Sequence, residues 1–107
     1  MLRNGSYSAW FRTPLREGTG IVELNNGKVT GGDPVFAYSG SYFQNGDRFS
    51  ASLTTRRHTQ GQPSVFDMDN VELTVNGKST PTTAFCTGTA KQAPDLAFEA
   101  IFVRIAD

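Results

Sequence analysis

The chain alternates between apolar and polar residues with a period of two over most of its length. The clearest case is RFSASLTTR, Arg48–Arg56, where Phe49, Ala51 and Leu53 share one face and the residues between them are polar. Successive side chains of a β-strand point to opposite sides, so this pattern is typical of a strand with one buried face. It predicts a chain built from half-buried strands.

Turn residues separate segments of this kind. NNG at 25–27, GGDP at 31–34 and QNGD at 44–47 are rich in Asn, Gly, Pro and Asp, which suit tight turns. The pattern predicts eight strands: Gly5–Thr13, Gly18–Leu24, Lys28–Thr30, Val35–Phe43, Arg48–Arg56, Val71–Gly77, Thr82–Ala90 and Leu96–Ile105. Connections this short require antiparallel pairing, because parallel strands need long crossovers.

Eight consecutive antiparallel strands leave two open edges unless the sheet closes on itself. We therefore predict an all-β fold, an eight-stranded antiparallel up-and-down β-barrel that occupies residues 1–107 as a single domain. A barrel of this size is either filled by its own side chains or holds one small ligand.

The expected interior mixes small and large side chains. The small ones either leave room for a ligand or offset the bulk of inward Phe residues; they are Ala9, Gly20, Ala37 and Ala51. A lipocalin-like binder of an apolar or lipid-like molecule would hold it among Phe11, Val22, Phe49, Leu53, Leu73, Phe85 and Phe98.

The last strand is apolar on both faces. Leu96, Phe98, Ala100 and Phe102 fall on one face, and Ala97, Ile101, Val103 and Ile105 fall on the other, interrupted only by Glu99. Such a strand needs cover on both sides. In a chain without helices we expect a second copy to supply it, in a homodimer interface formed by Trp10, Ile101, Val103 and Ile105.

The alternative cover for that strand is the loop Thr59–Asn70, within the longest connection, His58–Asn70. This segment is expected to fold locally around Val65, Phe66 and Met68. If it lies over the last strand, no second copy is needed.

Composition narrows the function. Ten basic and ten acidic residues give a formal net charge of zero, which disfavours direct nucleic-acid binding by charge. The single cysteine excludes an intrachain disulfide. No apolar run reaches the roughly 18 residues of a membrane helix, and the first residues have no signal-peptide core, so we expect a soluble cytoplasmic protein without a membrane partner.

Motifs for chemistry are weak. TGGD, residues 30–33, lacks the helix and the Lys of a phosphate loop, and Asp33 is expected to accept hydrogen bonds from local N–H groups. DMDN, residues 67–70, lacks the spacing of a calcium loop and is interpreted as a surface acidic cluster, as Arg56, Arg57 and His58 are interpreted as a solvated strand end.

His58 and Cys86 are the only residues of their types, and Cys86 is expected to be a small apolar filler in a strand rather than a nucleophile. We therefore expect no catalytic residues, no metal site, no cofactor and no enzymatic activity.

The order of motifs resembles the opening half of the GrlR family, the negative regulators of type III secretion in enteropathogenic bacteria. The resemblance covers about residues 4–56 and is carried by NGSYSAWF, GxGI, NG, TGGD and YSG. The matching positions are Gly5, Tyr7, Ser8, Phe11, Gly18, Gly20, Ile21, Asn26, Gly27, Thr30, Gly31, Gly32, Asp33, Tyr38 and Gly40.

The resemblance implies a calycin-like barrel, a dimer, an apolar interior able to accept a lipid-like molecule, and a regulator that sequesters a transcriptional activator without touching DNA. The family presents an acidic EDED loop to its activator. Here the corresponding stretch is Gln44, Asn45, Gly46 and Asp47, of which only Asp47 is acidic. This change removes most of the charge that would steer a basic partner.

Overall fold

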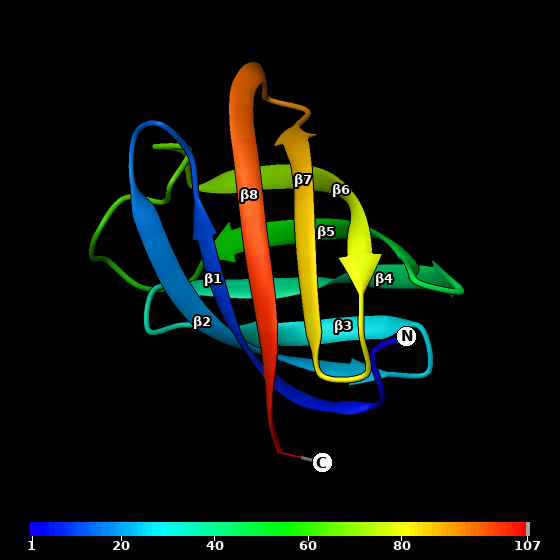
Figure 1. Ribbon diagram of the computed structural model, residues 1–107. Helices are drawn as coiled ribbons and strands as arrows, with labels where there is room; N and C mark the ends of the chain where they lie inside the picture. The colour runs from blue at the N-terminus through cyan, green and yellow to red at the C-terminus, as the bar shows by residue number, and fades with distance from the viewer. Residues whose placement is uncertain (107) are drawn as a thin grey trace.

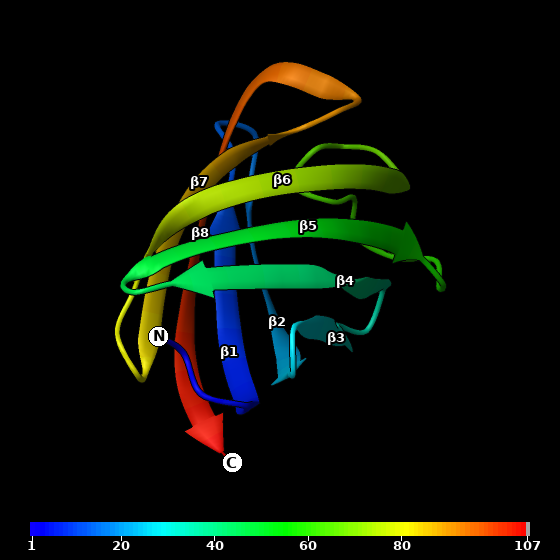
Figure 2. The same cartoon turned by 90° about the vertical axis from the view of Figure 1, so that its right-hand side faces the viewer.

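The computed structural model describes residues 1–106, and they form a closed barrel of eight strands. The strands are β1 (Gly5–Arg12), β2 (Glu17–Asn25), β3 (Lys28–Gly32), β4 (Phe36–Asn45), β5 (Arg48–Arg57), β6 (Asn70–Ser79), β7 (Thr83–Ala90) and β8 (Ala93–Ala106). Each pairs antiparallel with the next, and β8 returns to β1 (Figures 1 and 2). The predicted all-β up-and-down barrel is confirmed.

The hairpin turns have the backbone that their sequences predict. Asn26 and Gly27, between β2 and β3, have φ values of 49° and 88°, as a two-residue type I′ turn requires. Gly46 between β4 and β5 also has a positive φ, 63°. The β7–β8 turn is tighter than expected, since Ala90 pairs with Ala93 and the last strand begins three residues earlier than Leu96.

No helix among the described residues is long and apolar enough to cross a membrane.

The inward face follows the alternation at most strands. Tyr7 and Ala9 of β1, Val22 and Leu24 of β2, and Ala51 of β5 are all buried. On β8 the two predicted faces are confirmed, with Phe98, Ala100 and Phe102 buried inside and Val103 and Ile105 exposed outside.

Ala37 was expected inside the barrel, and this is wrong. Its neighbours Phe36 and Tyr38 are 6% and 8% exposed and point inward, so the two-residue period of β4 sends Ala37 to the surface. The larger apolar side chains take the interior, because their burial removes more apolar surface from water.

Phe85 was also expected inside, and it is 49% exposed on the outer face. Its neighbours Ala84 and Cys86 point inward, where they pair with Phe102 and Ala100 of β8. The two-residue period of β7 therefore sends Phe85 to the outer face.

One end of the barrel, here called the closed end, is packed by aromatic rings. Phe49 stacks on Tyr42 at 5.7 Å and meets Phe102 edge-on at 6.0 Å between ring centroids. The N-terminal segment lies across this end (Figure 2), where Leu2 donates its N–H to Gln44 Oε1 at 2.7 Å and accepts from Gln44 Nε2 at 3.0 Å. Gln44 thus fastens the segment to β4.

The opposite end, here called the mouth, is bordered by the β3–β4 turn and by the β5–β6 connection. Val65 and Phe66 of that connection are buried, and Thr13 Oγ1 donates to the Val65 carbonyl at 2.5 Å. Met68, expected to join them, is 36% exposed. The connection therefore covers the mouth, and it leaves the outer face of β8 uncovered, contrary to the alternative that it covers that strand.

Candidate functional site

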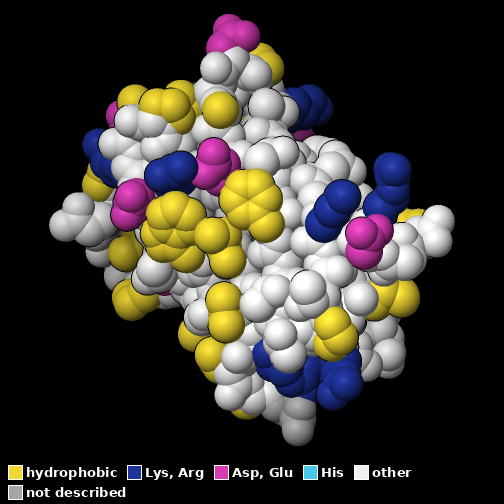
Figure 3. Space-filling view, viewed as in Figure 1, with side chains coloured by type: hydrophobic (Ala, Val, Ile, Leu, Met, Phe, Trp, Pro, Cys, Tyr) yellow, Lys and Arg dark blue, Asp and Glu magenta, His cyan; other side chains and the backbone are white. Residues whose placement is uncertain are grey.

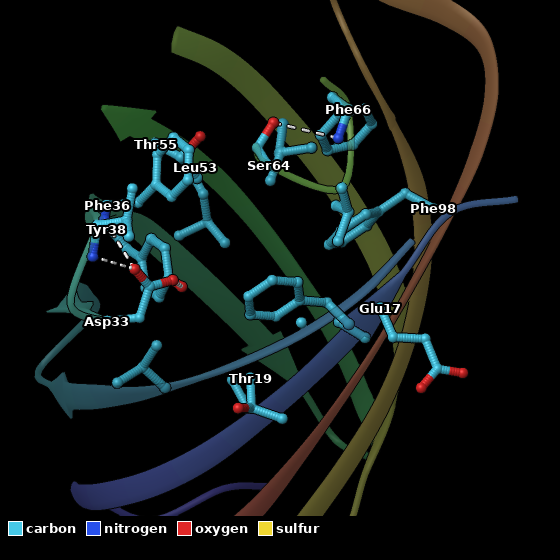
Figure 4. Close-up of a pocket in the computed structure, with 18 of the residues that line it drawn as sticks. Glu17, Thr19, Asp33, Phe36, Tyr38, Leu53, Thr55, Ser64, Phe66 and Phe98 are labelled. Atoms are coloured by element: carbon cyan, nitrogen blue, oxygen red, sulfur yellow. Dashed lines mark hydrogen bonds between the residues drawn. The ribbon is translucent and has the colours of Figure 1, made fainter. Parts of the chain in front are cut away.

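A cavity of about 430 Å³ lies inside the barrel and reaches the mouth. Its volume falls in the range of roughly 300–1,000 Å³ that small-molecule sites occupy. Its wall comes from β1, β2, β4, β5, β6 and β8, from residues 33–35 of the β3–β4 turn and from residues 62–66 of the β5–β6 connection (Figure 4).

Most of the wall is apolar. Five of the seven predicted interior residues line it: Phe11, Val22, Leu53, Leu73 and Phe98. Phe49 is buried but belongs to the closed end, where it packs on Tyr42 and Phe102 and does not line the cavity. Phe85 lies outside the barrel, as described above.

Aromatic rings form a connected group along the wall. Phe11 stacks on Phe98 at 6.3 Å and meets Tyr38 edge-on at 5.9 Å. Phe66, from the connection over the mouth, stacks on Phe98 at 5.4 Å. The four rings are therefore linked in a chain, Tyr38–Phe11–Phe98–Phe66, and all four line the cavity.

Glycine makes room for Tyr38. A Cβ atom added at Gly20 would stand 2.8 Å from the Tyr38 ring and hydroxyl oxygen. Gly20 is thus one of the small inward residues predicted from the pattern, and the space it leaves is taken by a neighbouring side chain. Both readings of the small residues therefore hold in part: Gly20 offsets an aromatic ring, while Ala9 and Ala100 border open volume.

The TGGD motif forms the corner at the mouth. A Cβ at Gly31 would collide with the Ile21 carbonyl oxygen of β2, and one at Gly32 would lie 2.6 Å from the Phe36 carbonyl oxygen, so both positions suit glycine. Thr30 is exposed on β3.

Asp33 closes this corner as predicted. Its Oδ1 accepts the N–H groups of Val35 at 2.8 Å and Phe36 at 2.7 Å. Its Oδ2 accepts the Tyr38 hydroxyl (Figure 4). Burial, and then this hydrogen bond to Asp33, raise the pKa of Tyr38 above its ordinary value, so the phenol stays protonated. The sequence indicated the backbone contacts of Asp33; the tyrosine partner and the position beside a cavity were missed, although Tyr38 stands five residues further on in an alternating strand.

Arg57 departs from the solvated strand end that was expected. Its Nε donates to Asp69 Oδ1 at 2.6 Å and its guanidinium lies 4.8 Å from the Phe36 ring centroid. Asp67, also from the acidic cluster, pairs with Arg16 at 3.6 Å. Within residues 1–106, no group of three or more His, Cys, Asp and Glu side chains is placed to hold a metal ion.

His58 and Cys86 are not brought together. His58 lies at the mouth, with Nε2 3.2 Å from the Asp33 carbonyl oxygen. Cys86 is fully buried between Gly77 and Ala100, and burial raises the pKa of its thiol to about 12. Cys86 is therefore an apolar filler, as the pattern predicts.

Part of the predicted partner-binding loop is engaged in hydrogen bonds within the chain. Gln44 is engaged with Leu2 and also accepts from Ser79 Oγ at 3.2 Å, so its amide is not presented to a partner. Asn45, Gly46 and Asp47 remain exposed at the β4–β5 turn.

The predicted dimer residues lie on the outer face of the barrel. Trp10 pairs with Ile101, which pairs with Phe85, across three adjacent strands. Val103 and Ile105 are 43% and 54% exposed on the same face. These five residues are here called the outer patch, and Figure 3 shows hydrophobic side chains gathered over this region.

No protein-family model and no curated protein matches the chain.

Proposed function

We propose that the protein binds a small apolar molecule inside the barrel. The observation that carries the proposal is the cavity of about 430 Å³ behind the mouth, lined by aromatic and aliphatic side chains. Apolar walls with few polar groups are the usual composition of small-molecule sites. An apolar guest would cover that wall. Each Å² of apolar surface removed from water would contribute roughly 25 cal/mol to the free energy of binding.

The test is to fill the cavity. Leu53→Trp places a larger side chain in the open volume and should abolish binding of the uncharged probe N-phenylnaphthylamine, measured by calorimetry and by native mass spectrometry. Ile21→Trp is the matched control, because Ile21 is 46% exposed on the outer face of β2. Equal binding to both variants, or no binding to the unmodified protein, would contradict the proposal.

A second candidate function is regulation through a protein partner, and the outer patch favours it. Exposed contiguous apolar surface usually marks an interaction site. We propose that a second copy of the chain covers the patch, and that the homodimer is a non-enzymatic, GrlR-like regulator that sequesters a transcriptional activator. The resemblance of residues 4–56 to that family supports the regulatory part.

Ile101→Glu tests the dimer, because Ile101 stands between Trp10 and Phe85 at the centre of the outer patch. Light scattering should report a dimer for the unmodified protein and a monomer for the variant, since a buried unpaired carboxylate is costly. Ile21→Glu, on the outer face of β2, should leave the dimer intact. A monomer at all concentrations for the unmodified protein would refute this candidate.

A further inference from the structure

Polar side chains are spread over the lining of the cavity, and Asp33 is the charged one at the β3–β4 corner of the mouth. Asp33 holds the turn before β4 and receives three hydrogen bonds, from the N–H groups of Val35 and Phe36 and from the Tyr38 hydroxyl. Figure 4 shows Asp33 beside Tyr38 and Phe36, across the cavity from Phe66 and Phe98. A guest whose chain lies among the rings therefore has Asp33 within the same wall.

Acceptor capacity decides what Asp33 offers to a guest. An ionised carboxylate has about four lone-pair sites and no donor. Three are taken by the contacts above, two on Oδ1 and one on Oδ2. The remaining site on Oδ2 can only accept, so a guest must bring a donor to it.

The charges around the cavity have one sign. Among the described residues that line it, the ionisable acids are Asp33 and Glu17, and no Lys, Arg or His is present. Glu17 is exposed at the rim.

The nearby basic groups are engaged elsewhere. The Arg57 guanidinium pairs with Asp69 and lies on the Phe36 ring, and His58 contacts the Asp33 carbonyl oxygen from an exposed position. A carboxylate in the cavity would lose its hydration, meet no cation in the wall, and face Asp33.

We infer that the cavity is specific for apolar molecules that carry a hydrogen-bond-donating head group, an alcohol or a protonated amine, and that it discriminates against fatty acids and other carboxylates. Asp33 is the residue that determines this specificity, and Tyr38 positions its carboxylate. The inference rests on the proposed binding function and names the ligand class of that site.

The test uses three probes of equal chain length that differ only in the head group: decanol, decylamine and decanoate. Each is titrated against bound N-phenylnaphthylamine, below its micellar concentration and at neutral pH. Decanol and decylamine should displace the probe, and decanoate should need a concentration about tenfold higher or more, because a desolvated charge without a partner is disfavoured.

Asp33→Asn removes the charge and keeps an oxygen that can accept the N–H groups of Val35 and Phe36. It should reduce the ratio of the displacing concentrations of decanoate and decylamine by about tenfold, as expected for loss of one charged contact. Asp47→Asn makes the same change at the β4–β5 turn and should leave this ratio of displacing concentrations unchanged. Because the three probes are also compared on the unmodified protein, an Asp33→Asn variant that fails to fold does not prevent the test.

The two proposals fail differently. If N-phenylnaphthylamine binds and all three probes displace it equally, or decanoate displaces it best, the head-group inference is overturned and binding in the cavity stands. If neither N-phenylnaphthylamine nor any of the three probes binds, the proposed function itself fails and the inference falls with it.

Discussion

The two ends of this barrel are built from similar residues and differ in how they are filled. At the closed end Phe49 has ring partners on two sides, Tyr42 and Phe102, and the N-terminal segment covers the opening. At the mouth Phe66 has a ring partner on one side, Phe98, and open cavity on the other.

The difference teaches where stability and binding reside in a small barrel. A ring that is surrounded by atoms gains dispersion contacts on all sides, while a ring beside a void lacks those contacts on one side. The closed end should therefore contribute most of the packing free energy. The mouth keeps apolar surface that faces the open cavity, and a ligand can cover it.

The largest expected effect comes from removing a ring at the closed end. Phe49→Ala should lower the free energy of unfolding by about 3–5 kcal/mol, because Phe49 is 2% exposed and its removal leaves a cavity. Phe66→Ala, the matched change at the mouth, should cost about 1–3 kcal/mol, since that residue already faces open space on a connection outside the strands. Urea unfolding of both variants measures the difference, and equal losses would refute the contrast between the ends.

A smaller effect is expected from releasing the N-terminal segment. Gln44→Ala removes both hydrogen bonds with Leu2 and the contact with Ser79, and should cost about 1–2 kcal/mol. Asn45→Ala, at the neighbouring exposed position, should change stability by less than about 0.5 kcal/mol. Hydrogen exchange at Leu2 should accelerate in the first variant only, and similar exchange in both would show that Gln44 does not fasten the closed end.

The sequence predicts the strands better than it predicts the contacts between distant segments. Alternation and turn chemistry were sufficient for the strand order and closure, because a two-residue period and Asn-Gly turns act locally. They were also sufficient for the inward faces of β1, β5 and β8. The inward face of β4 did not follow from the pattern, as Ala37 shows: Val35, Phe36, Ala37 and Tyr38 are consecutive apolar residues, so the alternation does not say which face is buried.

What the pattern could not supply depends on contacts between distant segments. Phe85 and Cys86 are neighbours of similar apolar character, and only the register of β7 on β8 places Cys86 inside against Ala100 and Phe85 outside against Ile101. In the same way the sequence predicted Gln44 as a turn residue, because no neighbouring residue indicates its hydrogen bonds to Leu2, 42 positions away. Asp33 was placed correctly in its turn, but the cavity that it lines also needs six strands and the β5–β6 connection.

The smallest expected effect concerns the polar group at the mouth. Burial and the Asp33 hydrogen bond raise the pKa of Tyr38 in the folded protein. An ordinary tyrosine has a pKa of about 10, so above that pH the unfolded chain releases a proton that the folded chain keeps. The stability that depends on this group is therefore fully present below about pH 10 and is lost as pH rises further.

Tyr38→Phe removes the titrating group. At neutral pH it should lower the free energy of unfolding by about 1 kcal/mol, through the lost hydrogen bond to Asp33. Between about pH 9 and 11 the stability of the unmodified protein should fall more steeply than that of the variant, so the gap between them should shrink and then reverse. Urea unfolding across this range measures both curves. Parallel curves would mean that Tyr38 ionises as readily in the folded protein as in the unfolded chain, and that its surroundings at the mouth do not favour the neutral phenol.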